Sequence, residues 1–110
     1  PVRRVLRQEL EKDGIGVLEA PNGEEAMDIF LREHPDLIIL DFLMPKMHGM
    51  ELLNKLRQDD WGKTVPVIFL TNFVDDPKLK KAVEAGQCDM ISKGDTDLST
   101  IISTIKAKLT

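Results

Sequence analysis

Apolar residues along the chain follow two different periods, one typical of helices and one typical of strands. In five segments they recur every three or four residues, the spacing that places them on one face of an amphipathic helix. The last segment has the clearest pattern, with an apolar residue at nearly every turn. The predicted helices cover residues 2–14, 22–34, 52–56, 79–86 and 98–109.

Four shorter segments are mostly apolar and lie next to turn residues, as is typical of buried strands. They are residues 15–18, 37–40, 67–70 and a short segment around Met90 and Ile91. Helices and strands therefore alternate along the chain. This order predicts an α/β fold whose parallel strands are joined by right-handed crossovers, with helices on both faces of the sheet.

Polar residues beside these segments predict where helices begin and end. Asp, Asn, Ser and Thr cap a helix N-terminus by accepting a backbone N–H, and glycine suits the left-handed position after a C-terminus. The expected N-caps are Asn22 with Glu25 as its capping partner, either Asp75 or Asp76, and either Asp95 or Thr96. Gly86 is expected to end the fourth helix.

The predicted order begins with a helix, whereas the helices of such a fold normally follow a strand. We therefore expect the first strand of a flavodoxin-like doubly wound (βα)5 sheet to lie upstream of Pro1 and to be missing from this chain. In the strand order 2-1-3-4-5 that strand is central, so its loss leaves a gap in the sheet. Residues 1–110 are interpreted as one domain without a linker or an internal repeat.

Length and composition narrow the class of protein. A chain of 110 residues can bury one hydrophobic core. Its 15 basic and 19 acidic residues give a formal net charge of -4 without blocks of like charge, so neither nucleic acid nor an anionic membrane is favoured as a partner. The single cysteine, Cys88, cannot form an internal disulfide, and no apolar run approaches the roughly 20 residues that span a bilayer. These features favour a cytoplasmic protein.

The loop DFLMPKMHGM, residues 41–50, has two interpretations. Met44, Met47, His48 and Met50 have the soft side chains and close spacing of copper(I) sites. Methionine is also a common core filler, however, and the loop opens with the carboxylate of Asp41 directly after a predicted strand. The favoured interpretation makes Asp41 the functional residue.

Asp41 has counterparts at the ends of two other predicted strands. Thr71 follows residues 67–70, and Lys93 follows the segment around Met90. Each residue alone has an ordinary explanation as a turn or loop residue. Because the carboxyl ends of parallel strands meet at one edge, we expect the three to lie together. A carboxylate there can act as a nucleophile toward a phosphoryl group, while a hydroxyl and an ammonium stabilise its oxygens.

Four stretches of the chain resemble, in order, the motifs of receiver domains of two-component response regulators. These stretches are APNGEEAM, PDLIILDFLMPKMHGMELL, PVIFLTN and AGQCDMISKG. The spacings from Asp41 to Thr71 and to Lys93 also agree with that family's pattern. The resemblance covers essentially all 110 residues and implies a single receiver domain that lacks its first strand and acidic loop.

The resemblance implies specific roles. Asp41 would accept a phosphoryl group from a phosphohistidine on a histidine kinase or phosphotransfer protein, with Mg²⁺ bridging carboxylate and phosphoryl oxygens. The carbonyl of Leu43 would be another Mg²⁺ ligand. Thr71 would contact the phosphoryl group and turn inward on activation, and Lys93 would pair with it.

The same resemblance implies a signalling switch rather than a turnover enzyme, with at most self-phosphorylation and autodephosphorylation. The last two helices and the strand between them would pass the signal to an output domain or target that the sequence does not name. Whether these helices also form a homodimer is left open by their composition.

The sequence departs from the family at several positions. The family's paired acidic Mg²⁺ ligands follow the first strand, so we expect this chain to bind Mg²⁺ poorly, and Asp75 and Asp76 are expected to be helix caps rather than substitutes. Met90 stands where the family usually has an aromatic ring, which puts the aromatic version of the switch in doubt. Gly94 replaces a proline after the lysine, so a cis proline cannot hold that loop. His48 replaces a common aspartate.

Two other classes of function remain alternatives. One is a protein-interaction module with the receiver fold that works without phosphorylation, which an upstream strand ending in two acidic residues would argue against. The other is a flavin protein of the same topology. The second lacks support because no phosphate-cradling loop precedes a helix and aromatic residues make up only 5% of the chain.

Overall fold

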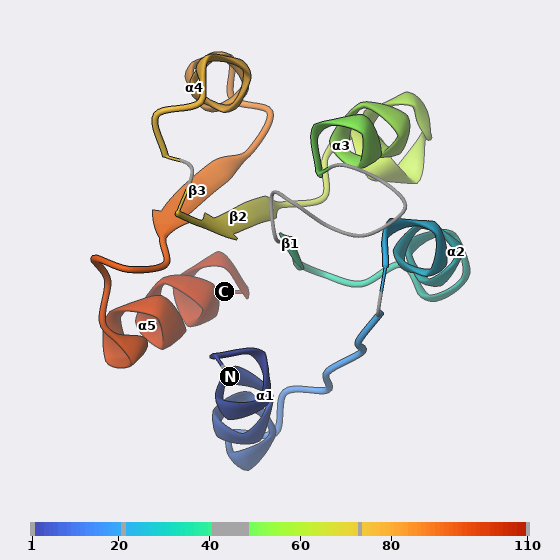
Figure 1. Cartoon of the computed structure of the whole chain (residues 1–110). Coiled ribbons are helices and arrows are strands. Elements are labelled where there is room, and N and C mark those ends of the chain that lie inside the picture. Colours follow the sequence, from blue (N-terminus) through green and yellow to red (C-terminus); the bar gives the residue numbers. More distant parts are fainter. Residues whose placement is uncertain (1, 21, 41–48, 73, 110) are drawn as a thin grey trace.

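The computed structural model of the protein describes residues 2–20, 22–40, 49–72 and 74–109. Its elements are α1 (Val2–Lys12), α2 (Gly23–Glu33), β1 (Ile38–Leu40), α3 (Gly49–Gln58), the 3-10 helix η1 (Trp61–Lys63), β2 (Val67–Thr71), α4 (Pro77–Glu84), β3 (Asp89–Ser92) and α5 (Leu98–Leu109). The strands form a parallel sheet between two layers of helices (Figure 1). No described helix combines the length and apolar character that crossing a bilayer requires.

The sheet has the order β1-β2-β3 among the described residues, with β2 in the middle. β1 and β2 pair in parallel with Ile38 opposite Val67, and β2 and β3 pair with Thr71 opposite Ser92. The predicted α/β fold and the strands expected at 37–40, at 67–70 and around Met90 are therefore confirmed.

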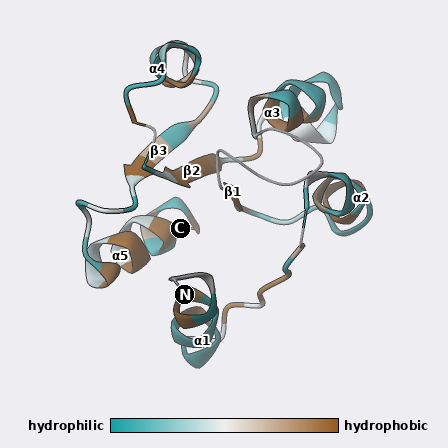
Figure 2. Cartoon of the chain, viewed as in Figure 1, coloured by the Kyte–Doolittle hydropathy of each residue, from teal (hydrophilic) through white to brown (hydrophobic). Residues whose placement is uncertain are grey.

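Two hydrophobic clusters fill the space on the two sides of the sheet. Alternate residues of β2 point to opposite faces, so Val67 and Phe69 pack with α2, α3 and α4, whereas Ile68 and Leu70 pack with α1 and α5. All five residues of β2 are buried. The helices turn their apolar sides toward this strand, as the hydropathy colouring shows (Figure 2). This double coverage explains the continuous apolar run in the sequence.

The strand predicted at residues 15–18 is wrong, because this segment has no regular secondary structure. Ile15 and Val17 are half-buried against the cluster beside α1 and α5, while Leu18 is 57% exposed. An extended segment becomes a strand only when its backbone groups join a neighbouring ladder. Among the described residues β1 pairs with β2 alone, and no strand lies beside residues 15–18.

Most of the expected helix caps are confirmed. Asn22 accepts the backbone N–H of Glu25 at 3.0 Å, and Asp76 accepts the N–H groups of Lys78 and Leu79 at 2.9 and 3.2 Å. Gly86 has the predicted left-handed backbone, with a φ of 75°.

The cap predicted for α5 is wrong by one or two residues. The carboxylate that accepts the N–H of Thr100, at 2.8 Å, belongs to Asp97 rather than to Asp95 or Thr96. Asp95 accepts the hydroxyl of Ser92 instead, at 3.2 Å. Several capping residues stand in a row here, and only the first helical turn decides which of them is used.

Arg57 at the end of α3 holds together two connections that lie far apart in the sequence. Its Nη1 donates to the carbonyl oxygens of Gly62 and Val65, at 2.7 and 2.8 Å, and its Nη2 donates to that of Gln87 at 2.5 Å. The connection from α3 to β2 passes so close to α3 that a Cβ on Gly62 would lie 2.0 Å from the Leu56 carbonyl oxygen. The guanidinium therefore links the entries to β2 and β3.

We predict that Arg57→Met lowers the free energy of unfolding by about 2 kcal/mol, because three carbonyls lose a charge-assisted donor. Arg57→Lys, which has the charge but not the planar fork, should lie in between. Urea denaturation measures both. The matched control is Arg32→Met, on exposed helix surface with a 3.9 Å ion pair to Glu33, which should change stability by less than about 0.5 kcal/mol. Equal losses at residues 32 and 57 would contradict the linking role.

Candidate functional site

The carboxyl ends of the three strands meet at one edge of the sheet, as the parallel pairing requires. β1 ends at Leu40, β2 at Thr71 and β3 at Ser92. Leu40 is opposite Phe69, and Thr71 is opposite Ser92. The sequence places Asp41 directly after β1 and Lys93 directly after β3. The edge that carries the predicted site residues is therefore present in the fold.

Thr71 and Lys93 are adjacent at this edge. Thr71 is the last residue of β2 and only 1% exposed, and its carbonyl accepts the backbone N–H of Lys93 at 2.8 Å. A hydroxyl in such a position is held by the packing around it, because the strand before it is buried on both faces. No buried side-chain oxygen or nitrogen in the described part of the chain lacks a hydrogen-bond partner. The residues that carry the hydroxyl and the ammonium, Thr71 and Lys93, therefore have neighbouring backbones.

The other predicted site residues lie outside the described residues. These are Asp41 and Leu43, together with Met44, Met47 and His48 of the copper(I) alternative. The last methionine of that alternative, Met50, is described and packs half-buried against the cluster of α2, α3 and α4. In the described ranges no three His, Cys, Asp or Glu side chains gather into a group that could hold a metal ion.

The loop after β3 is fixed by polar contacts that the sequence analysis did not predict. The hydroxyl of Ser92 donates to Asp95, and Asp97 accepts both the N–H of Thr100 at 2.8 Å and the hydroxyl of Ser99 at 3.1 Å. These contacts connect β3 to α5 around Lys93, where the family's proline is replaced. Their sequence signal was the run of Asp and Ser residues, which identifies a turn but not the pairing within it.

Asn72 joins this loop to the one after β2. A Cβ built on Gly94 would lie 3.3 Å from the Asn72 Oδ1, so the Asn72 side chain rests against the backbone of Gly94. The two loops that carry Thr71 and Lys93 therefore touch through side chain as well as backbone. A larger residue at position 94 would require Asn72 to move by a few tenths of an ångström.

Met90 occupies the position of the expected aromatic switch residue. It is opposite Phe69 in the sheet and packs half-buried against the cluster on the side of α2, α3 and α4. An unbranched thioether can change rotamer within such a cluster at little cost.

Asp97 gives a test of how the loop after β3 is held. Hydrogen bonds from Thr100 and Ser99 hold the pKa of the Asp97 carboxyl below its ordinary value. A lowered folded-state pKa means that this stabilisation is complete above the unfolded pKa of about 3.9 and is lost as the pH falls through the folded value.

We therefore predict that Asp97→Ala lowers the urea midpoint at neutral pH and that this deficit shrinks as the pH falls below about 4. Asp97→Asn keeps an acceptor but does not titrate, so the wild type should lose more stability than Asp97→Asn over the same pH range. Urea titrations at several pH values measure this. A deficit of Asp97→Ala that is unchanged by acid would contradict the assigned cap.

Comparison with known proteins agrees with this geometry. A model of the family described as response regulator receiver domain matches residues 1–106. The chain belongs to this family. The chain is 40% identical over 92 residues to a probable transcriptional regulator ycf27 of Porphyridium aerugineum, which covers 84% of the chain and 37% of that relative. The chain thus spans little more than a third of the length of that curated relative.

In two further comparisons the match extends over a larger share of the other protein. An uncharacterized 14.6 kDa protein of Leptolyngbya boryana is 37% identical over 91 residues, which are 83% of this chain and 70% of that protein. The solved receiver domain of a signal transduction histidine kinase from Syntrophus aciditrophicus is 34% identical, with a TM-score of 0.81 over 97% of this chain and 80% of that structure. The flavodoxin-like receiver fold is therefore shown by sequence and by structure. A receiver domain of such regulators is not a conventional enzyme.

Proposed function

We propose that this receiver domain accepts a phosphoryl group on Asp41 from a phosphohistidine of a partner histidine kinase or phosphotransfer protein. The observation that carries the proposal is the adjacency of Thr71 and Lys93 at the carboxyl edge, joined by the 2.8 Å backbone hydrogen bond, one strand away from the end of β1. Asp41 is the first residue after that end.

The chemistry follows from the three side chains. An oxygen of the Asp41 carboxylate attacks phosphorus, and the bond from phosphorus to the imidazole nitrogen breaks with its electron pair left on that nitrogen. The nitrogen takes up a proton from water, so the products are an acyl phosphate and a neutral histidine. The Thr71 hydroxyl donates to a phosphoryl oxygen, and the Lys93 ammonium offsets the added negative charge. Beyond this transfer we propose at most self-phosphorylation from small donors and autodephosphorylation.

Mg²⁺ is the metal that this chemistry calls for, since a hard cation neutralises charge between carboxylate and phosphoryl oxygens. In the described part of the chain no three His, Cys, Asp or Glu side chains gather into a group that could hold it. We propose the Asp41 carboxylate and the Leu43 carbonyl as ligands, completed by a further pair of acidic side chains.

We propose that this pair ends a further strand, which lies between β1 and residues 15–18. Among the described residues β1 has a partner on one side only, and residues 15–18 run without a partner strand although Ile15 and Val17 already pack inward. A strand there would satisfy the backbone groups of both neighbours.

Hydrogen exchange tests the added strand. In the parent protein, we expect the amides of Leu18 and Ile39 to be much better protected than in residues 1–110 alone, because each would gain a ladder partner. The amides of α4 serve as the control and should keep similar protection. Unchanged exchange at residues 15–18 in the parent protein would exclude a strand at this place.

The surface of α4, β3 and α5 is the proposed output of the switch. It contains Met90 and begins at the two loops joined by Asn72 and Gly94. Because a relative is named a transcriptional regulator and extends well beyond the matched region, we propose a separate output domain or target for this surface. As part of a two-component pathway the domain would act in the cytoplasm, and a homodimer through α4 and α5 is one form that the output could take.

The test of the proposed function is labelling of the full parent protein with acetyl phosphate and Mg²⁺, followed by intact mass. We expect the mass of one phosphoryl group on the wild type, none on Asp41→Asn, and strong loss on removal of Mg²⁺ with a chelator. Asp36→Asn is the matched control, because Asp36 precedes β1 as Asp41 follows it.

Thr71→Ala should still be labelled but should fail to change the output surface. If the wild type stays unlabelled, the alternative of a phosphorylation-independent interaction module is favoured instead. Equal labelling of Asp41→Asn would contradict Asp41 as the acceptor.

A further inference from the structure

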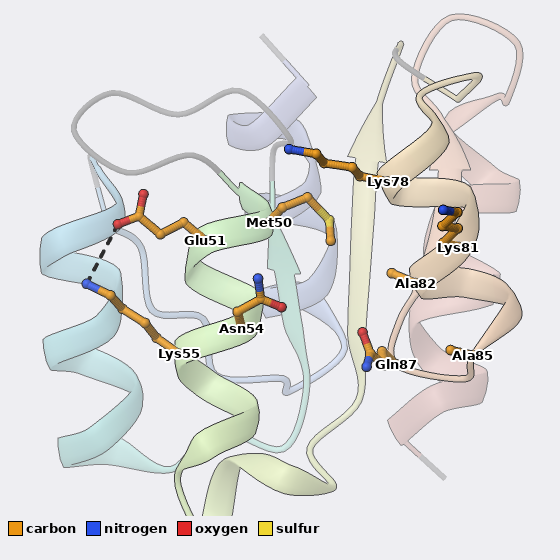
Figure 3. Close-up of a pocket in the computed structure, with 9 residues that line it drawn as sticks. All are labelled: Met50, Glu51, Asn54, Lys55, Lys78, Lys81, Ala82, Ala85 and Gln87. Carbon is orange, nitrogen blue, oxygen red and sulfur yellow. Dashed lines mark ion pairs between the residues drawn. The ribbon is translucent and has the colours of Figure 1, made fainter.

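A groove of about 770 Å³ runs between α3 and α4, away from the surface formed by α4, β3 and α5. Figure 3 shows Met50 and Asn54 directed from α3 toward α4, with Gln87 at the lower end and Lys78 reaching across the upper end. The residues that line it are Met50, Glu51, Asn54, Lys55, Lys78, Lys81, Ala82, Ala85 and Gln87.

The charge of the groove differs from that of the whole chain. Three lysines and one glutamate line it, whereas the chain has a formal net charge of -4. Lys55 is in an ion pair with Glu51 at 3.7 Å. Lys78 and Lys81 have no ion-pair partner among the described residues. By contrast, ion pairs with acidic side chains are made by Lys12, Lys55, Lys63, Lys80, Lys106 and Lys108.

Lys80 lies in the same helix as Lys78 and Lys81 but differs from them in having an ion-pair partner in the described part of the chain. It is in an exposed ion pair with Asp75 at 3.4 Å, whereas the two lysines of the groove have no such partner among the described residues. Two cations without an ion-pair partner on one side of an acidic protein attract an anionic partner.

The remaining lining residues fit a peptide better than a simple anion. Ala85 and the thioether of Met50 supply apolar surface over the buried Ala82, and the amides of Asn54 and Gln87 can each donate to and accept from a backbone. Apolar contacts with a few polar groups between cationic ends suit an extended chain that carries both acidic and aliphatic side chains.

We propose that this groove docks an acidic peptide segment of a partner protein. Its carboxylates bind Lys78 and Lys81, and a small aliphatic side chain packs on Ala85 and Met50. The interaction goes beyond the proposed phosphoryl transfer and does not require Asp41 to be phosphorylated.

The probe is a short fluorescent peptide of glutamate, alanine and leucine, titrated with the unphosphorylated chain at about 0.1 M salt and followed by anisotropy. The double variant Lys78→Glu/Lys81→Glu should bind at least about tenfold more weakly, because each attraction becomes a repulsion. The control Lys12→Glu/Lys106→Glu makes the same change of net charge on α1 and α5, which pack on the other side of the sheet. It should bind within about twofold of the wild type, since at about 0.1 M salt charges more than roughly 10 Å apart are largely screened. Circular dichroism checks that both variants are folded.

Amide chemical shifts locate the peptide, and we expect the largest changes at Asn54, Lys81 and Gln87. Equal weakening by the two double variants would overturn the proposal, as would equal binding of a peptide with lysine in place of glutamate. Shift changes confined to β3 and α5, or tighter binding of inorganic polyphosphate than of the peptide, would overturn it as well.

Discussion

The burial of β2 on both faces and its pairing on both edges are the constraint on which the rest of this structure depends. A strand of five buried residues cannot be stable unless helices cover each face, and here α2, α3 and α4 cover one while α1 and α5 cover the other. Its neighbours β1 and β3 satisfy its backbone. Because both neighbours run parallel to it, all three strands end at one edge, and Thr71 and Lys93 lie there.

The same strand also fixes the position of Thr71 at that edge. Thr71 is the last residue of a fully buried strand, so its position is set by the core rather than by the loop that follows it. The loops after β2 and β3 are in turn attached to each other by the hydrogen bond between Thr71 and Lys93 and by the contact of Asn72 with Gly94. A change of charge at this edge therefore acts on two loops at once, and these loops begin α4 and α5.

Much of the fold was predictable because its decisive signals are local. The apolar runs identified β1, β2 and β3, and Asn22, Asp76 and Gly86 identified helix ends from single residues. What the sequence could not supply depends on distant partners. Residues 15–18 have strand composition, yet a strand exists only where another strand lies beside it.

Arg57 is a second case in which a partner distant in the sequence decides the contact. Nothing in the local sequence shows that its guanidinium reaches the carbonyl of Gln87, thirty positions away. The predicted cap of α5 was wrong because Asp95, Thr96 and Asp97 are equivalent candidates until the first helical turn is placed. At the site, the sequence was enough to place Thr71 and Lys93 side by side at the ends of their strands, whereas their contacts through Asn72 and Ser92 could not be predicted.

The groove and the carboxyl edge are built from the same connections. One wall, α3, begins after the segment that contains Asp41, and the other wall, α4, begins after the loop that follows Thr71. Met50 and Lys78 lie in the first turns of these two helices, so the upper end of the groove adjoins the edge where the phosphoryl group is proposed to lie. Any rearrangement of these loops that changes the spacing of α3 and α4 changes the affinity of the groove. By thermodynamic linkage, a peptide bound there must then shift the equilibrium of the switch by the same factor.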